Sequence, residues 1–246
     1  MTKRSLLLPA LFAAASCLPG AASAALYTTA LGSQIASLSD CDDCYSGPYG
    51  FGAGHSLSYF GGSYNGLYVG SNGYVTLGEG VSDFVTRPLD TQDLAPMIAA
   101  LFTDLDSRAD DASRVYVNTA QAGQIIVTWS QMGHYDTTYS VRSTFQLVIR
   151  SDQFAYAKGE GQVGFFYDTI TDDAIASAGF GDGYFPSIPG EVALFLGPAS
   201  AQSGAAPRWF VLRDGIPDVV GQVPEPGALG LAALGLLGLG LRRRRG

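Results

Sequence analysis

Four carboxylates stand close together near the middle of the chain, at Asp104, Asp106, Asp110 and Asp111. Side chains two residues apart on a β-strand point to the same face, so Asp104 and Asp106 are expected on one side of a strand. Asp110 and Asp111 follow in a predicted loop. Carboxylate oxygens are preferred ligands of calcium, so the four side chains predict a calcium site, and no other cofactor is expected. The alternative is a solvated edge neutralised by two neighbouring arginines, Arg108 and Arg114.

A cysteine pair forms the motif Cys41-Asp42-Asp43-Cys44. In an exported protein this spacing predicts a local disulfide that closes a small loop. A redox-active pair would favour cationic neighbours that lower the thiol pKa, whereas the two aspartates would raise it. A zinc site would need further ligands, and the two histidines lie far away in the sequence. The sequence therefore favours a structural disulfide over both alternatives.

Motifs typical of enzymes are absent from the sequence, including G-x-S-x-G, H-E-x-x-H and the glycine-rich phosphate loops. The histidines, His55 and His134, precede a serine and a tyrosine, and no spacing assigns either of them a catalytic partner. The chain is therefore predicted to be non-enzymatic. A hydrolase of exopolysaccharide that uses two carboxylates remains a lower-ranked alternative.

These side chains must be positioned by β structure, because the body of the chain consists of short apolar runs separated by turns. The turn dipeptides are Asn65-Gly66, Asn72-Gly73, Asp182-Gly183 and Asp214-Gly215. Ten strands are predicted between the turns: 67–69, 74–77, 98–102, 115–118, 125–129, 144–150, 163–167, 174–180, 193–196 and 209–213.

Alternation of apolar and polar residues is clearest in two of these strands. Ile125, Val127 and Trp129 share one face of the first strand, and Phe145 begins the corresponding face of the second. Trp129 and Phe145 are therefore predicted core residues. Many short strands with regular turns indicate an all-β fold, a single sandwich or a barrel.

Several segments, in order along the chain, resemble the nidogen-like (NIDO) domain. The run from Phe60 to Val75 contains Leu67-Tyr68-Val69 and Asn72-Gly73, and the run from Leu94 to Asp106 contains Phe102-Thr103-Asp104-Leu105-Asp106. Further similar segments, together spanning about residues 49 to 185, are 126–129, 134–135, 144–149, 164–168 and 178–183. The resemblance implies an extracellular matrix or adhesion context and attaches no chemistry to the domain.

The N-terminal segment is typical of a secretory signal peptide. Lys3 and Arg4 precede an apolar run, and Ala22-Ser23-Ala24 fits the small-x-small pattern that signal peptidase cleaves. Ala25 is then the first mature residue. A weak lipobox before Cys17 leaves lipidation as an alternative.

The last part of the chain has three elements that together predict a membrane-sorting signal. Pro224-Glu225-Pro226 precedes an uncharged apolar run, Gly227 to Leu241. As a helix of 15 residues this run would be about 22 Å long, shorter than the ~30 Å hydrocarbon core of a membrane. The run is followed by four arginines, which are expected on the cytoplasmic side: Arg242, Arg243, Arg244 and Arg245.

This arrangement resembles the PEP-CTERM sorting signal of Gram-negative bacteria. The resemblance implies a transient inner-membrane anchor, processing by an exosortase, and delivery to the cell surface or extracellular matrix. An ordinary C-terminal transmembrane anchor is the alternative.

Loss of both sorting segments would leave a strongly acidic protein. Six of the 14 cationic residues lie in these segments, and a cut after Pro226 would retain all 22 acidic residues, which gives a mature charge of 8 − 22 = −14. Such a charge disfavours nucleic acid and anionic polysaccharide as partners and permits divalent cations or neutral glycans.

The predicted organisation has five segments: signal peptide 1–24, N-terminal extension 25–48, nidogen-like domain 49–216, linker 217–222, and sorting signal 223–246 with transmembrane helix 227–241. We expect an exported, non-enzymatic protein of the cell surface or of a biofilm matrix. Its expected partners are signal peptidase and exosortase during export, and a matrix component or exopolysaccharide afterwards. A calcium-dependent carbohydrate-binding module is the alternative from another functional class.

Overall fold

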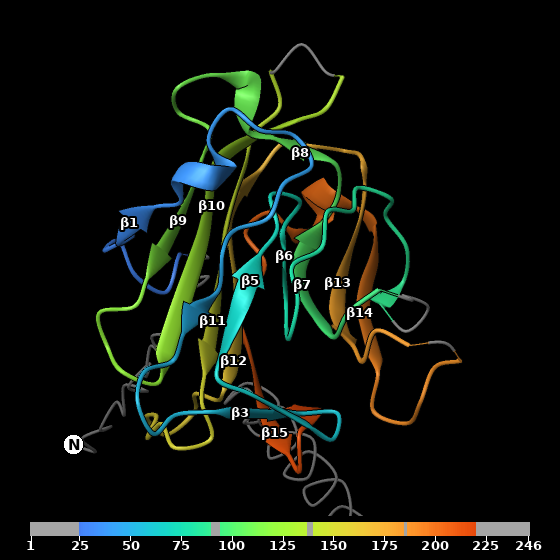
Figure 1. The fold of residues 1–246 in the computed structure, drawn as a ribbon. Helices are drawn as coiled ribbons and strands as arrows, with labels where there is room; N and C mark the ends of the chain where they lie inside the picture. Colours follow the sequence, from blue (N-terminus) through green and yellow to red (C-terminus); the bar gives the residue numbers. More distant parts are fainter. Residues whose placement is uncertain (1–24, 90–93, 137–139, 185, 220–246) are drawn as a thin grey trace, which may run out of the picture.

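Two antiparallel sheets pack face to face and form a β-sandwich (Figure 1). The structure is a computed structural model that describes residues 25–89, 94–136, 140–184 and 186–219. The all-β class is as predicted, and of the two architectures left open, a sandwich or a barrel, the structure shows the sandwich.

The larger sheet has eight strands in the order β1-β9-β10-β11-β12-β15-β16, with β8 also pairing with β10. Its strands are β1 (Ser33–Gln34), β8 (Leu105–Asp106), β9 (Arg114–Asn118), β10 (Gln124–His134), β11 (Ser143–Arg150), β12 (Val163–Ile170), β15 (Arg208–Arg213) and β16 (Ile216–Val219).

The smaller sheet has six strands in the order β14-β13-β7-β6-β5-β2. Its strands are β2 (Tyr49–Gly50), β5 (Gly66–Val69), β6 (Tyr74–Thr76), β7 (Met97–Phe102), β13 (Ile175–Gly181) and β14 (Val192–Pro198). A separate hairpin pairs β3 (Leu57–Tyr59) with β4 (Gly62–Tyr64). Short 3₁₀ helices lie at Ala36–Leu38, Ser107–Ala109 and Ala199–Gln202.

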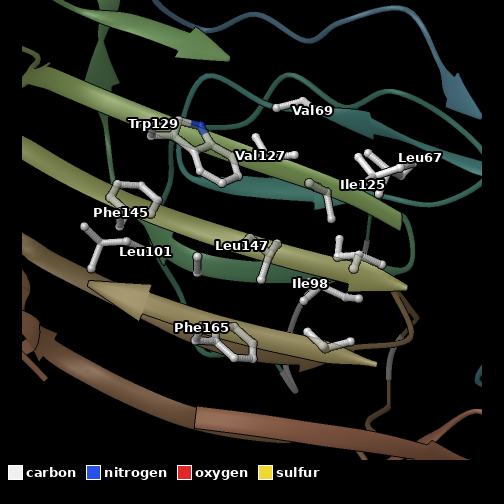
Figure 2. Close-up of a cluster of buried hydrophobic side chains, with 14 of the residues drawn as sticks. Leu67, Val69, Ile98, Leu101, Ile125, Val127, Trp129, Phe145, Leu147 and Phe165 are labelled. Carbon is white, nitrogen blue, oxygen red and sulfur yellow. The ribbon is translucent and has the colours of Figure 1, made fainter. Parts of the chain in front are cut away.

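The core lies between the sheets, where alternating residues of β10 and β11 pack with residues of β5, β7 and β12 (Figure 2). Trp129 is fully buried and stacks on Phe145, with ring centroids 5.0 Å apart and planes at 13°. The indole Nε1 of Trp129 donates a hydrogen bond of 3.0 Å to the carbonyl oxygen of Gly70, beside the smaller sheet. The tryptophan thus joins the two layers through both packing and a hydrogen bond.

All ten predicted strands are present, and β10 is much longer than expected. The prediction ended it at Trp129, whereas the strand continues to His134 across an irregularity where Gln131 has a φ of 51°. This bulge interrupts the alternation of apolar and polar residues, so the sequence pattern does not predict the second half of the strand.

The predicted domain boundaries are corrected at both ends. Residues 217–219 of the expected linker belong to β16, which pairs with β15 from Phe210 to Arg213. The expected N-terminal extension is part of the domain, because β1 pairs with β9 and because Ile35 and Leu38 are buried in the core. Backbone pairing therefore extends the folded body beyond the predicted limits of 49–216.

No helix within the described residues has the length and apolar character needed to cross a membrane. The predicted signal peptide 1–24 and the predicted transmembrane helix 227–241 lie outside the described residues.

Gly73 occupies the predicted hairpin turn between β5 and β6 with a φ of +83°, and an added Cβ would overlap the carbonyl oxygen of Leu101. Gly159 has a similar φ of +91° but open space around it. Alanine at either position costs roughly 1–2 kcal/mol for the left-handed backbone. We expect Gly73→Ala to lower the free energy of unfolding by about 2 kcal/mol more than Gly159→Ala, as measured by urea denaturation. Equal losses would contradict the close approach of Leu101.

Candidate functional site

The disulfide loop from Cys41 to Cys44 presents two carboxylates at one end of the sandwich. The cysteines are bonded, with Cα atoms 6.2 Å apart, in agreement with the predicted disulfide. On one side, the hydroxyl of Ser107 accepts from the Cys41 amide at 2.9 Å. On the other, the amide of Ser71 donates to the Cys44 carbonyl at 2.8 Å. The loop is therefore fixed between the β5–β6 turn and the segment after β8.

Asn72 connects this loop to the interior. Its side chain is fully buried, and its Nδ2 donates to Asp43 Oδ1 at 2.8 Å and to the Asp83 carbonyl at 3.0 Å. Its Oδ1 accepts from the amide of Leu105 at 2.8 Å. A buried amide that forms all these bonds holds three separate segments in one arrangement.

Three carboxylates converge at this point: Asp42, Asp43 and Asp104. Each offers an oxygen, and these oxygens lie within 4.8 Å of one another. Burial is the largest effect that raises the pKa of Asp104, to about 6, and the neighbouring charges of Asp43 and Asp42 add to it. His134 opposes the shift. The raised pKa of Asp104 therefore reflects burial first, and second the negative charge of its neighbours, which His134 offsets only in part.

Asp42 is divided between two environments. Its Oδ2 forms an ion pair of 2.7 Å with Arg108. Its Oδ1 is buried and has no hydrogen-bond partner among the described residues. Burial, Asp106 and Asp43 raise the pKa of Asp42, and Arg108 lowers it. A buried carboxylate oxygen without a donor fits a hard cation, so these residues are compatible with calcium.

His134 lies beside the carboxylates, at the end of β10. Its Nδ1 is 3.1 Å from Asp172 Oδ2, and this contact is the main cause that raises the pKa of His134 above its usual value. The adjacent amide of Tyr135 donates to the Asp104 carbonyl at 3.0 Å. Pairing of β8 with β10 therefore places the histidine near Asp104.

The four aspartates predicted to form a calcium site do not converge, because the chain turns sharply after Asp106. Asp106 caps the 3₁₀ helix Ser107–Ala109 and binds Arg108 at 2.8 Å. Asp110 pairs with Arg142 at 2.7 Å, and Asp111 pairs with Arg114 at 3.0 Å. Among the described residues only Asp104 belongs to the observed cluster. Asp106 and Asp111 pair with Arg108 and Arg114, the partners named in the alternative, but Asp110 pairs with Arg142 and Asp106 is buried rather than solvated.

The two partners of Asp104 were assigned no metal-binding role in the sequence interpretation, although Asp42 and Asp43 stand inside the cysteine motif. Their closed loop was the available signal, since a disulfide across four residues keeps the two intervening carboxylates close together. Their proximity to Asp104 depends on Asn72 and could not be inferred from spacing. The sorting-signal residues Pro224, Glu225 and Pro226 and the arginines 242–245 lie outside the described residues.

The histidine contacts do not form a catalytic triad among the described residues. His55 Nδ1 lies 2.7 Å from the hydroxyl of Ser151, a residue that is fully buried. The carboxylate Asp172 pairs instead with His134. The serine–histidine and histidine–aspartate contacts thus belong to two different places, and the serine is closed to a substrate.

A shallow groove of about 410 Å³ lies along β5 and the adjoining turns. Its lining carries no charged side chain and consists of Pro48, Gly50, Ser63, Tyr64, Asn65, Gly66, Tyr68 and Gly78. The Tyr64 ring lies against Gly62, where an added Cβ would overlap it. Tyr68 contacts the exposed Tyr45 edge-to-face at 6.5 Å. The groove therefore combines tyrosine rings with backbone polar groups and no charge.

Comparison with known families identifies the two parts of the chain. The NIDO-related family model matches residues 20–192, and the model of the PEP-CTERM protein-sorting motif matches residues 222–245. No curated protein and no solved structure matches the chain. The sorting motif implies processing by an exosortase and export to the cell surface. Because the first match covers most of the sequence, the chain belongs to the NIDO-related family and carries a PEP-CTERM protein-sorting motif.

Proposed function

We propose that this protein is a non-catalytic adhesive component of the cell surface or extracellular matrix. The observation that carries the proposal is the combination of a NIDO-related domain with a PEP-CTERM motif in one chain. Both are non-catalytic kinds of domain. For an exported domain of a non-catalytic kind, binding is the function that fits best. At the cell surface, the available partner is a matrix component or exopolysaccharide.

The uncharged groove at β5 supports a neutral glycan as the contact. A mature charge of 8 − 22 = −14 repels anionic polysaccharide, so attraction must come from uncharged surface. Tyrosine rings offer apolar faces to the C–H groups of a sugar, and their hydroxyls and nearby backbone groups offer hydrogen bonds. Close packing of Tyr64 against glycine holds its ring in place before a ligand arrives, which lowers the entropy cost of binding.

The glycan contact can be tested with the exopolysaccharide of the producing bacterium, separated by anion exchange into neutral and anionic fractions. In affinity electrophoresis we expect the mature protein to be retarded by the neutral fraction. Tyr68→Ala, in the groove, should weaken retardation at least about tenfold. Tyr116→Ala, on β9 of the other sheet, should leave it unchanged. Equal weakening by both variants, or no retardation by either fraction, would refute the groove. Release of reducing ends would favour the hydrolase.

We propose calcium binding as a second function, in which calcium stabilises the same adhesive domain as part of a carbohydrate-binding module. The observation that favours it is the convergence of Asp42, Asp43 and Asp104, with one oxygen of Asp42 buried and lacking a donor. Calcium takes six to eight oxygen ligands, so the three carboxylates would supply part of its shell, and carbonyls or water the remainder.

Titration calorimetry of the chelator-treated mature protein tests this second function. We expect heat of binding with calcium chloride, and at least about tenfold weaker binding in Asp104→Asn, because one of three charged ligands is lost. Asp111→Asn serves as the matched control, since Asp111 is fully exposed and lies outside the cluster. The idea fails if the wild-type protein gives no heat, or if the two variants bind calcium equally well.

The raised pKa of Asp104 predicts a pH dependence in the absence of calcium. The pKa is about 6 in the folded protein against an ordinary value of 3.8, so the folded chain retains a proton that the unfolded chain releases. Ionisation of Asp104 therefore lowers stability as the pH rises from about 4 to about 6. We expect Asp104→Asn to melt at the wild-type temperature near pH 4 and above it near pH 7. A melting-temperature difference that shrinks as the pH rises would show that the ionised carboxylate is stabilising.

A further inference from the structure

The outer strands of the two sheets differ in how well they are protected against pairing with another chain. Exposed edges are normally kept short or carry charge or proline. The larger sheet ends in β1, which has two residues, and in β16, which contains Pro217 and Asp218. The smaller sheet ends in β2, which also has two residues, and in β14. Three of the four outermost strands of these two sheets, as far as the described residues show, are thus short or carry charge and proline.

The remaining outer strand, β14, is longer than the other three and contains no charged residue. It runs for seven residues, Val-Ala-Leu-Phe-Leu-Gly-Pro, from Val192 to Pro198, and pairs with β13 on one side. It lies at the outer margin of the smaller sheet (Figure 1). No ionisable residue occurs from 192 to 207. A bulge at Leu194 and the terminal proline limit the regular ladder, yet Phe195, Leu196 and Gly197 remain in register with β13.

Exposed apolar side chains accompany this edge. Leu196 is 52% exposed and Ile175 of β13 is 54% exposed. Leu196 is opposite Ser177 and Pro198 is opposite Ile175, so the exposed side chains share one face of the sheet. A strand added along β14 would bury part of this apolar face while its backbone paired with the open edge.

We propose that β14 pairs with β14 of a second copy of this chain. In a symmetric contact residue i meets residue j of the partner and j meets i, so the same patch lies on both sides and like charges in it would face each other. With a mature charge of 8 − 22 = −14, most of this surface repels itself, and an uncharged apolar strand does not. The charge-free edge therefore fits a second copy. One strand pair buries less area than a stable dimer usually does, so the contact is weak in dilute solution and strengthened by crowding at the cell surface.

Sedimentation equilibrium of the mature protein tests this proposal. We expect concentration-dependent dimers that become tighter as salt screens the negative charge. Leu196→Lys should weaken dimerisation at least about tenfold, because it places like charges across the symmetric edge. Ile216→Lys is the matched control, since Ile216 is also exposed, at 41%, and lies on the guarded edge β16. Circular dichroism establishes that both variants are folded.

A cross-link distinguishes strand pairing from a general change in surface charge. Both mature cysteines are already bonded to each other, so Leu196→Cys would add one free thiol at the edge. Oxidation should convert this variant, but not Ile216→Cys, to a covalent dimer. A wild-type protein that stays monomeric at all concentrations, or equal cross-linking of the two cysteine variants, would overturn the proposal.

Discussion

The buried side chain of Asn72 is the interaction on which the candidate site depends. An amide enclosed by protein must satisfy its donors and acceptor internally, because an unpaired polar group there costs roughly 1–3 kcal/mol. Asn72 does so by binding the side chain of Asp43, the carbonyl of Asp83 and the amide of Leu105. The carbonyl oxygen of Gly70, next to this turn, accepts a hydrogen bond from the indole of Trp129 in the opposite sheet. One tight turn therefore sets both the spacing of the layers and the position of the carboxylates.

Periodicity identified the regular parts of the long strands, but it missed β10 beyond its bulge and the strands of only two residues. The alternating side chains of β10 and β11 identified Trp129 and Phe145 as core residues because each strand buries one face between the sheets. Strands of two residues, such as β1 and β8, contain no period to detect, and their pairing is decided by distant partners. The edge strand β16 was predicted to be a linker because it contains Pro217 and Asp218. Proline and charged residues are typical of linkers and also of protected edge strands.

The candidate site was only partly predictable for the same reason. Asp104 lies in the observed carboxylate cluster, but the expectation that Asp106 would join it assumed a continuous strand. The chain instead turns into a 3₁₀ helix, where the side chain of Asp106 accepts hydrogen bonds from the backbone amide and the guanidinium of Arg108. Local hydrogen bonds at a turn outweighed the two-residue period. The partners of Asp104 came from a loop about 60 residues earlier (104 − 43 = 61), which no local pattern connects to it.

The disulfide makes the cluster a fixed feature rather than one that a cation must assemble. Closing the loop at Cys41 and Cys44 restricts Asp42 and Asp43 before any ligand is present, so the cost of ordering them is met in folding. The same restriction prevents the carboxylates from moving apart to relieve their repulsion. Arg108 partly compensates Asp42 and His134 partly compensates Asp104, but the pKa of both carboxyl groups stays raised. A preformed and incompletely neutralised group of oxygens is what distinguishes this cluster from the arginine-paired aspartates a few residues away.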